Sequence, residues 1–320
     1  MVRLYMLTGF LGSGKTSVIN SLLGHLTEQR VGLIVNDFGP IVVDSALVAS
    51  SDSVVSTKSL SGGQIFCSCL SGKFVDSVEA MLPLGPDMII VEASGLAKPA
   101  PLLEIVSTIV QRSAGQVVYG GMICVVDAQR YHVILQSFKS LEEQVVFSDG
   151  CIVNKIDLVD TKVVDQVIGS IKRLRPLAPV FTTVGGEVRS EMLPLWQQPV
   201  SLESKRSIDA ASYAGWGLEG RPKTQLFTIE GPFSETMLRG FLTSISSSML
   251  RIKGFVPIGD GKAYLVDVVG PHVRVGSCWM PTAVSEGVVC IHRASLDAES
   301  LVKREWERHS DGSSRLKLLS

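Results

Sequence analysis

The sequence predicts an α/β protein with a mostly parallel, doubly wound sheet, followed by a smaller α+β domain. In the first 180 residues, short apolar runs alternate with helical patterns, as in parallel βαβ units. A glycine-rich loop directly follows the first of these runs. Beyond residue 223, apolar runs are joined by short glycine turns, which favour an antiparallel meander. We therefore expect domains over 1–190 and 224–320, joined by a linker over 191–223.

The first domain is expected to contain strands that are apolar at nearly every position. They are Val2–Leu7, Val31–Val35, Met88–Val91, Gly121–Val126 and Cys151–Val153, and Val180–Val184 is expected to be the last strand with its exit loop. Helical patterns lie between them, at Ser17–Leu26, Phe74–Met81, Leu102–Val110 and Val163–Leu174. Helices cover both faces of a parallel sheet, which explains strands of this kind and the high mean hydropathy of +0.30.

The second domain is expected to mix strands and helices. Strands are predicted at Gln225–Glu230, Leu250–Ile258, Ala263–Val269 and His272–Gly276. A helix is predicted over Ser234–Ser247, with Ser234 as its N-cap. The charged, serine-rich tail from Lys303 is expected to form a last helix and a frayed end.

Composition excludes several classes of protein. Hydrophobic residues make up 45% of the chain, which is too much for a disordered protein. The 30 basic and 31 acidic residues balance, so no global field favours nucleic acid or an anionic membrane. No apolar stretch approaches the ~20 residues that a spanning helix needs. Six cysteines make no disulfide framework, and we expect a cytoplasmic protein with reduced thiols and no nucleic-acid or membrane partner.

The glycine-rich loop Gly9-Phe-Leu-Gly-Ser-Gly-Lys15-Thr16 matches the phosphate-loop pattern G-x-x-x-x-G-K-[ST]. It lies between an apolar strand and a helical pattern, which is the context that such a loop requires. Lys15 is expected to hold the β- and γ-phosphates, and Thr16 to ligate Mg²⁺. The predicted phosphate-binding residues are Gly9, Gly12, Ser13, Gly14, Lys15, Thr16 and Ser17.

The segment Asn154-Lys155-Ile-Asp157 follows a predicted strand, where nucleotides bind in open α/β sheets. Asp157 is expected to accept from the two N–H groups of guanine, a pairing that adenine cannot reproduce. Asn154 is expected to fix the loop and touch the base edge, while the stem of Lys155 covers the ring. Together with the phosphate loop, this segment predicts a P-loop NTPase domain that binds GTP.

Two carboxylates are expected near the metal of the nucleotide. Glu92 ends an apolar strand and is placed to order Mg²⁺ or its water shell, and Gly95 follows it at a distance suited to the γ-phosphate. Asp37 follows the second strand and is expected near Mg²⁺ and the attacking water. We therefore assign Lys15, Asp37 and Glu92 to catalysis, with Thr16, Asp37 and Glu92 at the Mg²⁺ ion.

These motifs together resemble the CobW-type GTPases, relatives of the urease and hydrogenase maturation GTPases. The resemblance rests on the phosphate loop, Val35-Asn-Asp-Phe-Gly39, Glu92-Ala-Ser-Gly-Leu-Ala-Lys-Pro-Ala-Pro101 and Asn154-Lys-Ile-Asp157, in the family's order. Met249-Leu-Arg-Ile-Lys-Gly-Phe255 also resembles the start of that family's C-terminal domain. The resemblance implies a nucleotide-driven metallochaperone or metallocofactor-insertion protein.

The family's signature is a Cys-x-Cys-Cys turn, and this chain departs from it. Cys67 and Cys69 match two of the thiols, but Leu70 stands where the third would be. Two thiolates in a glycine-rich loop suit Zn²⁺, Co²⁺ or Ni²⁺, with a redox pair or inert thiols as alternatives. Pro40 replaces a residue that is often acidic in relatives. The remaining cysteines and two histidines of the second domain are expected to be structural: Cys124, Cys151, Cys278, Cys290, His272 and His292.

Three functional hypotheses remain from the sequence. The first is a slow GTPase that delivers a divalent metal or metallocofactor to a client metalloprotein, with a homodimer as one way to complete the cysteine site. The second is a GTP-gated interaction switch, for instance for a corrinoid-dependent enzyme, with no metal at Cys67 and Cys69. A small-molecule kinase is disfavoured, because Asn154–Asp157 selects a base rather than a phosphate acceptor.

Overall fold

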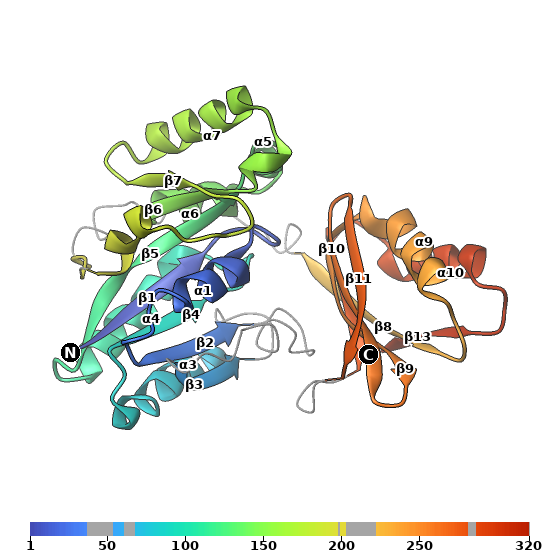
Figure 1. Cartoon of the computed structure of the whole chain (residues 1–320), viewed down its shortest axis with the longest axis horizontal. Helices are drawn as coiled ribbons and strands as arrows, with labels where there is room; N and C mark the ends of the chain where they lie inside the picture. The colour runs from blue at the N-terminus through green and yellow to red at the C-terminus, as the bar shows by residue number, and fades with distance from the viewer. Residues whose placement is uncertain (37–53, 61–67, 198, 203–221, 281–285, 320) are drawn as a thin grey trace. The chain divides into compact units, whose positions relative to one another are not determined.

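The computed structural model describes residues 1–36, 54–60, 68–197, 199–202, 222–280 and 286–319. These residues form two compact units, of which the first ends before residue 203 and the second begins at residue 222 (Figure 1). Each unit has its own sheet and its own hydrophobic core. In the described part of the chain, no helix is both long and apolar enough to cross a membrane.

The N-terminal unit is built on a seven-stranded sheet with the order β3-β2-β4-β1-β5-β6-β7. All of its pairings are parallel, as the sequence predicts. The strands are β1 (Val2–Thr8), β2 (Val31–Asn36), β3 (Val54–Leu60), β4 (Met88–Glu92), β5 (Val117–Asp127), β6 (Gly150–Asn154) and β7 (Val180–Thr182). The edge strand β3 was not expected, because its Ser-Thr-Lys-Ser segment lacks the apolar run of the others.

Helices cover both faces of this sheet. They are α1 (Lys15–Leu23), α3 (Ser68–Glu79), α4 (Pro99–Arg112), α5 (Tyr131–Ser137), α6 (Lys139–Val146) and α7 (Thr161–Leu174). Along β1, Leu4 and Met6 belong to the core with α3 and α4, whereas Tyr5 and Leu7 belong to the core with α1. The short helices α5 and α6 were not predicted, because extended Phe138 separates them before either can show a full apolar period.

The first part of the expected linker belongs to the N-terminal unit. Residues Ser190–Trp196 form a short 3-10 helix, η3. Its Met192 and Trp196 are buried in the core that contains α1, so apolar contacts hold this segment to the sheet in spite of Pro194. Most of the remaining predicted linker, residues 203–221, lies outside the described residues.

The C-terminal unit is a six-stranded antiparallel sheet with the order β11-β10-β9-β12-β8-β13. Its strands are β8 (Lys223–Glu230), β9 (Met249–Gly259), β10 (Lys262–Val269), β11 (His272–Trp279), β12 (Gly287–His292) and β13 (Arg315–Leu319). The helices α9 (Glu235–Ser246) and α10 (Ala298–His309) pack on this sheet, and the hydroxyl of Ser234 caps α9 as predicted.

Two features of this unit differ from expectation. The tail does not end in a frayed segment, because β13 pairs with β8 from Arg315 to Leu319. The strand β12 was not predicted, since its short apolar run has no period that separates a buried strand from a buried helix. In the sheet, β12 lies between β9 and β8 and is buried along its whole length.

Candidate nucleotide site

The loop between β1 and α1 has the backbone that only glycines adopt readily. The φ angles of Gly9, Gly12 and Gly14 are +135°, +75° and +101°. A Cβ atom on Gly9 would lie 2.1 Å from the carbonyl oxygen of Val125, and one on Gly14 would lie 2.2 Å from Nδ2 of Asn154. No side chain caps α1, which leaves the backbone N–H groups of its first turn for an anion.

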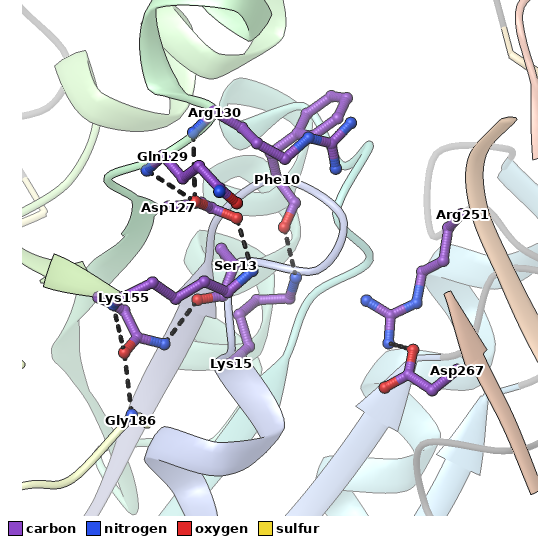
Figure 2. Close-up of polar contacts among 11 residues, drawn as sticks. Phe10, Ser13, Lys15, Asp127, Gln129, Arg130, Lys155, Gly186, Arg251 and Asp267 are labelled. Carbon is purple, nitrogen blue, oxygen red and sulfur yellow. Dashed lines mark hydrogen bonds and ion pairs between the residues drawn. The ribbon is translucent and has the colours of Figure 1, made fainter. Parts of the chain in front are cut away.

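The lysine of the loop lies against the loop itself. Lys15 is only 7% exposed, and its Nζ donates to the carbonyl oxygens of Gly9 at 2.8 Å and Phe10 at 3.3 Å. Figure 2 shows the ammonium group beside Phe10. The hydroxyl of Ser13 is buried and has no hydrogen-bond partner among the described residues. A cation and an unused hydroxyl thus lie in a cradle that a Cβ would fill, and both suit a phosphate.

The two expected Mg²⁺ ligands of the described part lie together. Thr16 Oγ1 donates to both carboxylate oxygens of Glu92, at 2.9 and 3.1 Å. Glu92 ends β4 and is 4% exposed. The chain then brings Gly95 against the phosphate loop, since a Cβ on Gly95 would lie 2.5 Å from the nitrogen of Leu11. Ser17, also predicted to bind phosphate, is exposed in the first turn of α1.

Asn154 joins the phosphate loop to the loop that was predicted to select the base. It ends β6 and is 2% exposed. Its Nδ2 donates to the carbonyl oxygen of Ser13 at 2.9 Å. Its Oδ1 accepts from the backbone N–H groups of Lys155 at 2.8 Å and Gly186 at 2.9 Å (Figure 2). One buried amide therefore holds three segments that are far apart in sequence.

Lys155 and Asp157 differ in how firmly they are held. Lys155 has a left-handed backbone with φ of +63°, and its Nζ forms a 2.6 Å ion pair with Asp127 (Figure 2). Asp127 is 4% exposed, and its Oδ1 also accepts from the backbone N–H groups of Gln129 and Arg130. Asp157, by contrast, is exposed in the 3-10 helix η2 (Ile156–Leu158), where a ligand can reach its carboxylate.

Sequence reasoning missed two residues of this site. Asp127 ends β5 in the same way as Glu92 ends β4, and that strand-end position was its signal. Gly186 follows the last strand β7, and its φ is +79°. A Cβ on Gly186 would lie 2.7 Å from Cβ of Ser17, so only glycine lets this loop approach α1. The Gly185-Gly186 pair was the available signal.

The predicted transition-metal site cannot be placed. Asp37, Pro40 and Cys67 lie outside the described residues, and Cys69 and Leu70 are described only as backbone in the first turn of α3. Among the residues whose side chains are described, no three His, Cys, Asp or Glu groups gather into a metal site.

Three of the four remaining cysteines, Cys124, Cys151 and Cys290, are buried core thiols. Cys124 and Cys151 are fully buried and lie opposite each other on β5 and β6. The hydrogen bond with Cys151 and burial raise the pKa of Cys124, which keeps its thiol protonated. Cys290 is buried in the C-terminal core, and Cys278 is half-buried.

Comparison with known proteins identifies the family. The family model of the CobW/HypB/UreG nucleotide-binding domain matches residues 3–182, which is more than half of the chain. The chain belongs to this family. The model of the cobalamin synthesis protein cobW C-terminal domain matches residues 223–308, so both domains of the CobW-family architecture are represented.

The names of several curated relatives of this CobW-family chain include the word zinc. The zinc chaperone YjiA of Escherichia coli is 26% identical over 196 residues, covering 58% of this chain and 59% of the relative. Zinc-regulated GTPase metalloprotein activator 1 of Dictyostelium discoideum is 24% identical over 296 residues, covering 78% of this chain and 62% of the relative. The chain thus spans about 60% of the length of the relatives it matches.

Among solved structures, the Zn(II)-bound YjiA GTPase from E. coli is similar to this chain. It is 18% identical, covers 97% of this chain and 99% of its own, and has a TM-score of 0.46.

Proposed function

We propose that this CobW-family chain binds GTP with Mg²⁺, hydrolyses GTP, and uses its nucleotide state to deliver a divalent transition metal to a client metalloprotein. The observation that carries the proposal is the amide of Asn154, which ties the phosphate loop at Ser13 to the Asn154–Asp157 loop. A phosphate cradle and a loop with the pattern that selects guanine are thereby parts of one site at the ends of β1 and β6.

The residues of the site divide into three roles. Lys15 holds the β- and γ-phosphates, aided by the backbone N–H groups from Gly9 to Ser17. Thr16, Glu92 and Asp37 hold Mg²⁺ or its water shell. Mg²⁺, when bound, supplies charge neutralisation at the phosphates. Asp157 accepts from the guanine N–H groups, and Gly95 approaches the γ-phosphate.

We assign the transported metal to Cys67 and Cys69, with Zn²⁺ as the first candidate and Co²⁺ as the second. The names of the curated relatives support zinc, and thiolate ligands suit both ions. Two thiolates do not fill a tetrahedral site, so other groups of the chain or a second copy in a homodimer complete it. We place the protein in the cytoplasm, with no nucleic-acid or membrane partner.

The test is metal affinity and stoichiometry of the purified chain, measured for Zn²⁺ and Co²⁺ with a GTP analogue, with GDP and without nucleotide. The proposal predicts that nucleotide changes the affinity, and by linkage that metal changes GTP affinity by the same factor. One ion per chain indicates a monomeric site, and half an ion indicates a shared site in a dimer.

Matched variants identify the ligands. The double variant Cys67→Ser, Cys69→Ser should lose tight metal binding and keep its GTP affinity in metal-free buffer. Cys278→Ser is the control, because this half-buried thiol of β11 lies in the other unit. If the double variant binds metal as tightly as the unsubstituted chain, the cysteines are not the site. The interaction switch, which the absence of a third thiol at Leu70 favours, then takes its place.

A further inference from the structure

The helix α6 carries a buried amide that contacts the segment between β4 and α4. We name residues 92–98 the second-switch segment, because it contains Glu92 and Gly95, which are assigned to Mg²⁺ and the γ-phosphate. Gln144 on α6 is 0% exposed, and its Nε2 donates to the carbonyl oxygens of Gly95 at 3.2 Å and Ala97 at 3.1 Å. Both of these hydrogen bonds go to the second-switch segment, and neither goes to the phosphate loop or the base loop.

The neighbouring residue of α6 holds the far end of the same segment. Glu143 is 3% exposed and accepts a hydrogen bond from the backbone N–H of Ala100 in the first turn of α4. Lys98 is the cation that stabilises its carboxylate. Two consecutive buried polar residues of one helix therefore contact the second-switch segment and the start of α4.

The helix that carries them is anchored to the sheet. Ser148 Oγ donates to the carbonyl oxygen of Val145 at 2.8 Å, which closes the last turn of α6. The backbone N–H of Asp149 donates to the carbonyl oxygen of Met122 on β5 at 2.6 Å. The chain then enters β6, which ends at Asn154. The C-terminal end of the helix that carries Gln144 is thus bonded to itself and to β5.

The two ends of the Gln144 amide differ in their partners. The nitrogen must face Gly95 and Ala97, because the opposite orientation would place its oxygen against two carbonyl oxygens. The oxygen Oε1 is buried and has no hydrogen-bond partner among the described residues. A buried oxygen without a hydrogen-bond partner is unfavourable. Oε1 is therefore available to accept a hydrogen bond from a backbone N–H group of the second-switch segment when that segment moves.

We propose that Gln144 is a positioning residue for GTP hydrolysis: it holds the second-switch segment so that Gly95 lies against the phosphate loop at Leu11. The proposal rests on the GTPase activity proposed above. Because Gln144 bonds neither the phosphate loop nor the base loop and reaches the nucleotide site only through Gly95 at the γ-phosphate, it acts on the catalytic step more than on nucleotide affinity. Substitution of a residue with a purely structural role would lower both kcat and GTP affinity, or neither of them.

The experiment compares Gln144→Met with the unsubstituted chain and with Tyr131→Phe. Methionine keeps the length of the side chain and removes both donors. Tyr131 on the adjacent helix α5 is also buried, and its hydroxyl bonds Ser170 at 3.1 Å away from the second-switch segment. We expect kcat for GTP hydrolysis to fall at least ten-fold in Q144M, with the Kd for GTP within two-fold. Y131F should keep both values.

A second variant, Gln144→Glu, keeps the test possible if Q144M does not fold, and it supplies a pH profile. An ionised carboxylate repels the two carbonyl oxygens, whereas a protonated carboxyl can donate to one of them. We expect the kcat of Q144E, relative to that of the unsubstituted chain, to rise as the pH falls from 8 to 5.5. Hydrogen exchange in peptides covering 93–98 should be faster in both variants than in Y131F.

The outcomes separate this proposal from the one it rests on. If the unsubstituted chain does not hydrolyse GTP, the proposed activity fails and the role of Gln144 with it. If the unsubstituted chain is active and Q144M has an unchanged kcat, only the role of Gln144 is overturned. Equal loss of kcat and GTP affinity in folded Q144M, or a pH-independent ratio for Q144E, also overturns it.

Discussion

Removal of the Asn154 side chain should destabilise the chain even when no nucleotide is present. In Asn154→Ala the carbonyl oxygen of Ser13 and the N–H of Gly186 lose their partner, and both bonds are buried. Each buried group left unpaired costs about 1–3 kcal/mol, so for the two groups we expect a loss of roughly 2–6 kcal/mol. The third bond, to the N–H of Lys155, is half-buried, and water can replace it there.

The assay is urea unfolding of the nucleotide-free protein, followed by GTP titration of the folded fraction. Asp157→Ala is the matched control, because Asp157 is exposed and its removal should change stability by less than about 0.5 kcal/mol. Both variants should lose GTP affinity, but only N154A should lose stability. An N154A protein as stable as the unsubstituted chain would refute the view that this amide holds the site together before the ligand arrives.

Two further predictions concern acidic residues. Asp157→Asn should weaken GTP binding and gain affinity for xanthosine triphosphate, which presents an acceptor where guanine presents a donor; equal binding of ATP and GTP by the unsubstituted chain would contradict the assignment. Burial raises the pKa of Glu143 from 4.5 to about 6, and the nearby charge of Lys98 opposes this shift. The folded state therefore favours the protonated carboxyl, and the stability that this provides is present below pH 4.5 and lost as the pH rises through about 6. Glu143→Gln should therefore gain about 1 kcal/mol over the unsubstituted chain between pH 5 and pH 8, after allowance for solvent screening, and parallel unfolding profiles for the two proteins would contradict this.

The sequence predicts those parts of the site that depend on local backbone chemistry. The phosphate loop is an example, because the left-handed angles at Gly9, Gly12 and Gly14 can be met only by glycine at fixed spacing. The strand ends are another, because parallel strands place their last residues at one edge of the sheet, where Glu92 and Asn154 lie. In both cases the signal lies within a few consecutive residues.

Contacts between segments far apart in the chain were not predictable in this way. The Lys155–Asp127 ion pair joins residues 28 positions apart, and Gln144 reaches Gly95 across 49 positions. Neither pairing leaves a pattern in the local sequence. The same reason explains the tail, where a charged and serine-rich composition favours a frayed end but backbone pairing with β8 makes a strand of Arg315–Leu319.

Two buried amides bond different segments around the site, and they differ in a way that bears on switching. Asn154 has partners on both its nitrogen and its oxygen, so a movement of the base loop breaks hydrogen bonds that are already made. Gln144 uses only its nitrogen, and its buried oxygen has no partner among the described residues. A shift of the second-switch segment can therefore lose one bond at Gln144 and form another. We expect base selection to depend on the fixed arrangement and a response to the γ-phosphate to depend on the adjustable one.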